Sequence, residues 1–136
     1  MGYALSTTID RPYDTVLAQV RTALADQGFG ILTEIDIKAT MKAKMDAELA
    51  PQVILGACRP PLALAALQAE PSIGLLLPCN VVVRSADDQT TVVEAVDPQT
   101  MVAMTANPAL RTVADDATSR LTAALDSLTS RPTEEE

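Results

Sequence analysis

The sequence predicts an α+β fold with a mainly antiparallel sheet in the order β-α-β4-α, helices packed on one face, and a long C-terminal helix. Three observations predict it. Apolar residues near both ends of the chain recur at helical spacing, and the segments between them are typical of strands. The last two of these strands flank a short polar turn. No repeat or change of composition divides the 136 residues, so we expect a single domain over residues 1–130 and a disordered acidic tail over 131–136.

The first strand and helix follow from a change of pattern. Residues 3–9 are typical of a strand, and Asp10 is expected to cap a helix that has Pro12 in its first turn and ends at Gly28. The apolar positions of this helix have helical spacing: Tyr13, Val16, Leu17, Val20 and Leu24.

From Phe29 to Ile37 the period changes to two, which predicts a half-buried strand. One face would carry Phe29, Ile31, Thr33, Ile35 and Ile37. A short amphipathic helix is expected next, because three apolar side chains recur at every fourth position: Met41, Met45 and Leu49.

The middle of the chain predicts a buried strand followed by a helix. Residues 52–58 form a continuous apolar run, which is typical of a central strand or of one covered on both faces. Pro60 and Pro61 favour the first turn of a helix with the sequence LALAALQA, which ends before Pro71.

After a turn at residues 72–74, a strand over 76–84 is expected to pair with one over 90–96 through the polar turn 86–89. Asp97-Pro98 and Asn107-Pro108 each combine a capping side chain with a first-turn proline, so they should start a short helix and then a long one. One stripe of the long helix is apolar: Leu110, Val113, Ala114, Ala117, Leu121, Ala124, Leu125 and Leu128.

Charge and composition exclude several classes of function. The net charge is −8 and the ten basic residues are scattered, which argues against nucleic-acid binding. Neither a signal peptide nor a membrane span is recognisable, so we expect a cytoplasmic protein with no membrane partner. In that compartment the two cysteines are expected to be reduced thiols.

The central strands also predict an assembly. Residues 53–58 and 75–83 are apolar on both faces, so a solvated second sheet face would expose a large apolar patch. We therefore expect a homodimer.

Several segments resemble the family called domain of unknown function 302, over about residues 3–128. They are Gly28-Phe29-Gly30, Gly56-Ala57-Cys58, Glu70-Pro71, Leu77-Pro78-Cys79-Asn80 and Asp97-Pro98. The resemblance implies a small bacterial or archaeal protein with a fold like half of the TATA-binding protein, usually dimeric. It implies no activity and no catalytic residue, because a fold does not define a function.

The candidate site comprises Cys58, Arg59, Pro78, Cys79 and Asn80, which lie in the most apolar part of the chain. Cys58 ends a strand ahead of Arg59 and a helix start, where free backbone N–H groups and Arg59 would favour a nucleophilic thiolate. The alternative is that Cys58 and Cys79 are small buried core residues. If their strands are neighbours, the two thiols could approach each other.

No cofactor is expected from the residues, and they leave open whether a metal ion binds. Zinc needs about four N or S ligands, and the chain has two cysteines and no histidine. Copper(I) could use thiolates with thioethers from Met41, Met45, Met101 or Met104, although methionines at helical spacing are typical of core packing.

Acid-base catalysis has little support. The carboxylates of Glu34, Asp36 and Glu94 could face one another across neighbouring strands, but an exposed polar face also explains them. Without a histidine or a recognisable nucleophile and base pair, a classical enzyme is not expected.

Two hypotheses for function follow. In the first, the protein is a homodimeric binding module that holds a small apolar ligand between sheet and helices, beside Cys58, Pro78 and Cys79. The alternative is a thiol-dependent role in redox response, sulfur handling or soft-metal binding through Cys58 and Cys79.

Overall fold

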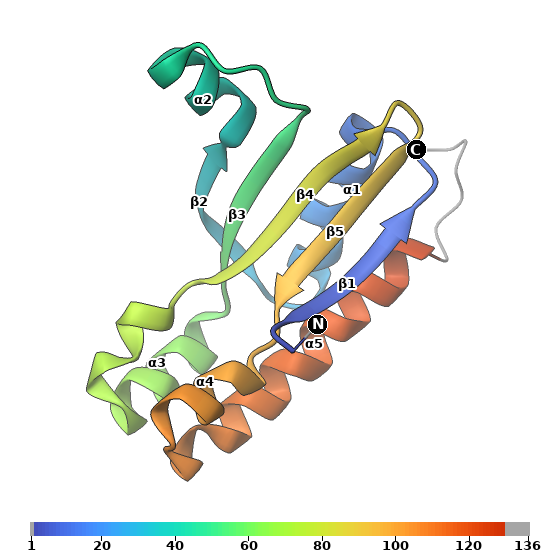
Figure 1. Cartoon of the computed structure of the whole chain (residues 1–136). Helices are drawn as coiled ribbons and strands as arrows, with labels where there is room; N and C mark the ends of the chain where they lie inside the picture. Colours follow the sequence, from blue (N-terminus) through green and yellow to red (C-terminus); the bar gives the residue numbers. More distant parts are fainter. Residues whose placement is uncertain (1, 130–136) are drawn as a thin grey trace.

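The computed structural model describes residues 2–129, and the predicted tail over 131–136 lies outside this range. Five strands form one antiparallel sheet in the order β1-β5-β4-β3-β2 (Figure 1). The strands are β1 (Ala4–Ile9), β2 (Gly30–Asp36), β3 (Gln52–Cys58), β4 (Cys79–Asp87) and β5 (Thr90–Val96). The predicted fold class and strand order are confirmed.

Two long helices cover one face of the sheet: α1 (Tyr13–Asp26) and α5 (Arg111–Thr129) (Figure 1). Their apolar stripes meet the alternating inward residues of the strands, such as Val83 and Val93, in the main core. All eight stripe positions predicted for the long helix are buried. The opposite face of the sheet, called the open face below, is covered by no helix of this kind from residues 2–129.

The remaining helices lie at the two ends of the sheet rather than over its face. At one end α3 (Pro60–Ala69), the 3-10 helix η1 (Pro71–Leu76), α4 (Gln99–Thr105) and the 3-10 helix η2 (Pro108–Leu110) gather around the first half of α5. A second apolar cluster, which includes Ile73, Met101 and Leu110, fills this end. At the other end α2 (Ile37–Met45) projects from the sheet, and none of its residues is buried.

Several element boundaries differ from the sequence prediction. Asp10 does not cap α1, because Pro12 occupies the N-cap position and its side chain makes no capping bond. The segment after α3 forms η1 instead of a turn, so β4 begins at Cys79 and not at residue 76. The helix α2 ends at Met45, because Asp46 adopts a left-handed conformation with φ 56°, and Leu49 lies beyond it.

The alternation predicted for β2 is interrupted. A bulge between Ile31 and Thr33 moves the rest of the strand by one residue against β3. Ile31 still pairs with Ala57 on the helix-covered face, whereas Thr33 pairs with Gly56 and Ile35 with Ile54 on the open face. The prediction that Ile31, Thr33 and Ile35 share one face is therefore wrong.

A buried charge links the start of α1 to the end of α5. Arg11 is 6% exposed, and its guanidinium donates hydrogen bonds to Gln19 Oε1 at 2.5 Å and to the carbonyl of Leu128 at 2.9 Å. The buried hydroxyl of Thr91 in β5 donates to the carbonyl of Arg11 at 2.8 Å. One polar cluster thus ties both covering helices to the sheet.

Candidate functional site

Four of the five predicted site residues line one small cavity at the junction of β3, β4 and α3. We call it the thiol cavity; its volume is about 30 Å³, and its walls are otherwise almost wholly apolar. It is lined by Phe29, Ala57, Cys58, Arg59, Leu62, Ala63, Ala66, Leu77, Pro78, Cys79, Met101, Val113 and Ala117. This volume accommodates a water molecule or two and excludes a fatty-acid-sized ligand.

The sheet register places the two cysteines at the same end of β3 and β4. The strands β3 and β4 are direct neighbours, and Ala57 at the end of β3 pairs with Cys79 at the start of β4. Cys58 is therefore one residue from the position opposite Cys79. Both thiols are free, with Cys58 partly exposed and Cys79 buried.

Two side chains pack closely over Gly56, next to the start of β4. An added Cβ at Gly56 would lie close to Thr33 Oγ1 and 2.8 Å from Pro78 Cγ, so both side chains occupy the space above this glycine. The peptide bond between Leu77 and Pro78 is cis. Pro78 thus packs directly on β3 immediately before Cys79 enters the sheet.

The positive environment expected around Cys58 is only partly present. Pro60 and Pro61 have no N–H, and the N–H groups of Leu62 and Ala63 both donate to the carbonyl of Arg59 at 3.0 Å. In this described part of the chain the first turn of α3 thus offers Cys58 no free donor, and that expectation is wrong. The helix cannot stabilise a thiolate through its N–H groups.

Arg59 itself remains available to the thiol cavity. Its side chain lies over the turn before β2, with Nε 3.0 Å from the position of a Cβ at Gly28. This Nε is buried and, among residues 2–129, lacks a hydrogen-bond partner. Buried donors without partners are rare and costly, so an unpaired Nε at a cavity wall can serve a group that enters the cavity.

The surroundings of Cys79 disfavour its thiolate. Burial raises the pKa of the Cys79 thiol, and the electrostatic effect of the nearby Cys58 raises it further. The two sulfurs are therefore close enough for charge on one to act on the other. At neutral pH Cys79 is held as a thiol.

Asn80, the fifth predicted residue, lies on the open face and outside the thiol cavity. It borders a hollow of about 350 Å³, called the polar hollow, which is lined by Tyr3, Ala4, Asn80, Val82, Arg84, Glu94, Ala95 and Val96. Arg84 Nη2 and Glu94 Oε1 are 3.3 Å apart in its floor. This distance exceeds the roughly 2.7–2.9 Å of strong charge-assisted bonds, so the guanidinium retains donors for another group.

A second hollow of about 340 Å³ lies next to it, towards α4, and we call it the apolar hollow. It is lined by Tyr3, Leu76, Cys79, Val96, Pro98, Thr100, Met101 and Met104. Tyr3 and Val96 border both hollows, while Cys79 and Met101 separate the apolar hollow from the thiol cavity. The three spaces are thus neighbours around the start of β4.

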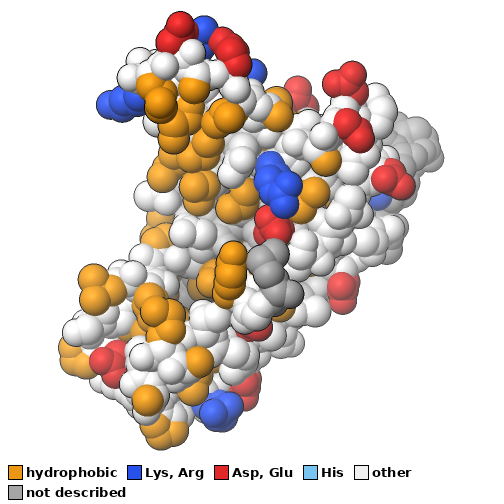
Figure 2. All heavy atoms as spheres, viewed as in Figure 1, with side chains coloured by type: hydrophobic (Ala, Val, Ile, Leu, Met, Phe, Trp, Pro, Cys, Tyr) orange, Lys and Arg blue, Asp and Glu red, His pale blue; other side chains and the backbone are white. Residues whose placement is uncertain are grey.

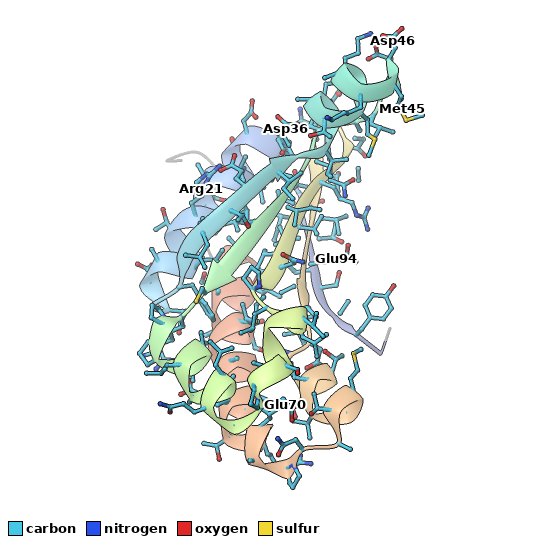
Figure 3. The ribbon with its side chains drawn as sticks, turned by 90° about the vertical axis from the view of Figure 1, so that its left-hand side faces the viewer. Arg21, Asp36, Met45, Asp46, Glu70 and Glu94 are labelled. Atoms are coloured by element: carbon cyan, nitrogen blue, oxygen red, sulfur yellow. The ribbon has the colours of Figure 1, made fainter. Side chains whose placement is uncertain are left out.

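The carboxylates considered for acid-base catalysis do not converge. Arg21 Nη2 of α1 holds Glu34 Oε1 at 2.8 Å, whereas Glu94 pairs with Arg84 on the open face. Figure 3 shows Arg21 and Glu94 on opposite sides of the sheet. Asp36 accepts a hydrogen bond from the N–H of Ala39 and so caps α2.

Two structural features are absent from residues 2–129. In this range no group of three or more Cys, Asp or Glu side chains is arranged to hold a metal ion. None of the described helices is long and apolar enough to cross a membrane.

Most of the residues that line the two hollows were not predicted from the sequence. Their walls come from residues before β1, from η1, and from β4, β5 and α4, which only the tertiary fold brings together. One signal was present in the sequence. Arg84 and Glu94 are charged residues within the otherwise apolar sequences of the two hairpin strands, one before the turn and one after it. A polar pair on otherwise apolar strands is a reason to look for a site.

The chain matches, over residues 5–128, the family described as "Domain of unknown function DUF302", and it belongs to this family. A solved structure described as an uncharacterized conserved protein DUF302 from Bacillus stearothermophilus is similar, with 28% sequence identity and a TM-score of 0.84. The similarity covers 93% of this chain and 98% of that one. The search of curated proteins gave no match.

Proposed function

We propose that this protein is a homodimeric binding module for a small amphiphile, and that the ligand lies in the two hollows of the open face. The adjoining hollows are the observation that carries this proposal. Each is within the range of about 300–1,000 Å³ that is usual for small-molecule sites. The thiol cavity, at about 30 Å³, is too small for this role.

The lining residues define the class of ligand. Leu76, Met101 and Met104 offer an apolar wall at one end, and methionines adapt to flexible chains. Arg84 and Asn80 offer hydrogen-bond donors at the other end. The arrangement suits a short apolar chain that ends in a hydrogen-bond acceptor such as a carboxylate or carbonyl group.

A second copy of the chain would complete the site. Small-molecule sites usually bury about 70–90% of the ligand, whereas these hollows open on one side. Apolar side chains gather at both ends of the open face, over α2 and over α3 and α4 (Figure 2). The exposed members are Leu32, Ile35, Met45 and Leu49 at one end, and Leu64, Leu67, Leu75 and Met104 at the other.

The centre of the open face also suits twofold pairing. It carries one cation and one anion side by side, Arg84 and Glu94, so each could face the opposite charge of a second copy. The apolar ends would then cover each other while the polar centre stays paired. A dimer of this kind encloses the hollows between two sheets.

The ligand site is tested by filling it. Val96→Trp places a bulky ring at the wall shared by both hollows, and Ala18→Trp on the exposed side of α1 is the matched control. A thermal-shift screen with short-chain carboxylates should find ligands for the wild type and the control, because a ligand at a hundred times its Kd adds about 2.7 kcal/mol. Val96→Trp should lose this shift. Equal shifts in both variants would place binding elsewhere.

The assembly is tested with a charge on α2. Met45 is 69% exposed, and Met45→Glu should convert a dimer into a monomer, because a buried unpaired carboxylate opposes association. Ala43→Glu, on the exposed opposite side of the same helix, should leave the dimer intact. Light scattering measures the mass against 14.3 kDa for one chain. A wild-type monomer at micromolar concentration would contradict the proposed assembly.

A further inference from the structure

The charged pair of the polar hollow leaves part of its bonding capacity unused. Arg84 Nε and Nη2 both approach Glu94 Oε1, at 3.4 Å and 3.3 Å, which are long distances for charge-assisted hydrogen bonds. Within residues 2–129 the structure gives neither Arg84 Nη1 nor Glu94 Oε2 a hydrogen bond. Both side chains line the hollow, so its wall offers one cationic donor and one anionic acceptor side by side.

The strands direct these charges to the same place as the other walls of the site. Asn80 and Arg84 alternate along β4 with residues of the main core, so both side chains lie on the open face. Glu94 of β5 shares that face, where it pairs with Arg84. Tyr3 and Val96 connect the polar hollow to the apolar hollow. A ligand whose charged group lies at the pair therefore has an apolar wall next to it.

The two neighbouring charges restrict the head group of the ligand. A carboxylate that accepts from Arg84 lies near the carboxylate of Glu94, and an ammonium that donates to Glu94 lies near the guanidinium of Arg84. Like charges at such short separations repel, whereas a head group with both charges gives each member of the pair a partner. Because the paired atoms of Arg84 and Glu94 are 3.3 Å apart, the two charges of the ligand must also be close together. In an α-amino acid a single carbon atom separates them.

We propose that the ligand is a free α-amino acid with an apolar side chain. The inference rests on the ligand site of the proposed function, and it uses the hollows of one chain rather than the assembly. Arg84 and Asn80 donate to the carboxylate, and Glu94 accepts from the ammonium. The side chain of the amino acid lies in the apolar hollow, against Met101 and Met104. Arg84 and Glu94 together determine the specificity for a head group that carries both charges.

The test compares three probes of equal chain length by isothermal titration calorimetry, with the full chain at neutral pH: norleucine, hexanoate and hexylamine. Norleucine should bind about tenfold more tightly than either of the others, because both of its charges have a partner. An affinity for norleucine no higher than that for hexanoate or for hexylamine would overturn this inference and leave the proposed ligand site standing. Binding of none of the three probes would overturn both.

Single variants assign the two charges. Glu94→Gln should abolish the advantage of norleucine over hexanoate, and Arg84→Gln should abolish its advantage over hexylamine. Arg21→Gln and Glu34→Gln change an ion pair on the other side of the sheet, so both affinity ratios should stay at the wild-type values (Figure 3). If a second copy of the chain occupied the charged pair instead, Glu94→Gln and Arg84→Gln would change the mass measured by light scattering and leave the ratios unaltered. That result would overturn the inference.

Discussion

Replacing Arg11 with methionine is expected to lower the free energy of unfolding by about 3 kcal/mol, because buried acceptors that lose their donor cost about 1–3 kcal/mol each. Arg11 donates to Gln19 Oε1 and to the carbonyl of Leu128, and both acceptors lie in the interior. Methionine keeps most of the apolar stem, so the measured loss reports mainly on the polar contacts. Urea unfolding followed by circular dichroism gives the difference directly.

A surface arginine provides the control. Arg21 binds Glu34 at 2.8 Å, but its side chain is 39% exposed and that of Glu34 is 45% exposed. Arg21→Met should change the free energy of unfolding by about 0–1 kcal/mol, because water screens this pair and solvates the carboxylate that remains. If the two variants lost equal stability, the Arg11 cluster would not have the structural role assigned to it.

The burial of Arg11 could not be predicted from the sequence. A single arginine between a strand and a helix is normally exposed, and nothing in its neighbours indicates otherwise. Its partners lie eight and 117 positions away, so its environment is a property of the tertiary fold. The burial of Thr91, eighty positions away, has the same origin.

The long helix represents the opposite case. Its eight predicted stripe positions follow from spacing alone and are all buried, because a helix of nineteen residues has only one way to hide a continuous apolar stripe. Seven of them lie in α5, and the first, Leu110, lies in η2 immediately before it. Strand β2 is short, and its pairing with β3 decides which residues face the core. The bulge before Thr33 therefore could not be predicted from alternation.

The candidate site was predictable in part for the same reason. Cys58 and Cys79 end and begin apolar runs, and the expected pairing of those runs brings both to one cavity. The hollows of the open face depend on Tyr3, Met101 and Met104, whose segments meet only through the packing of the sheet end. Local patterns specify the strands that carry the thiols, whereas the larger spaces arise between elements.

Replacing Gly56 with alanine is expected to destabilise the protein by about 1–3 kcal/mol, the usual cost of adding a methyl group to a packed region. The new Cβ would clash with Thr33 Oγ1 and lie 2.8 Å from Pro78 Cγ, which is closer than real Cβ contacts. Either Thr33 at the β2 bulge or Pro78 ahead of β4 must move.

Gly30 is the matched control, because it lies on the neighbouring strand β2 and its added Cβ would have its nearest contact at 3.9 Å, from the carbonyl oxygen of Cys58. Gly30→Ala should therefore leave stability within about 0.5 kcal/mol of the wild type. The double variant Gly56→Ala with Thr33→Ala removes the closest clash and should recover part of the loss, which a double-mutant cycle in urea unfolding measures. Strict additivity of the two changes would mean that Thr33 does not limit the space above Gly56, and the contact with Pro78 would then have to account for the whole cost.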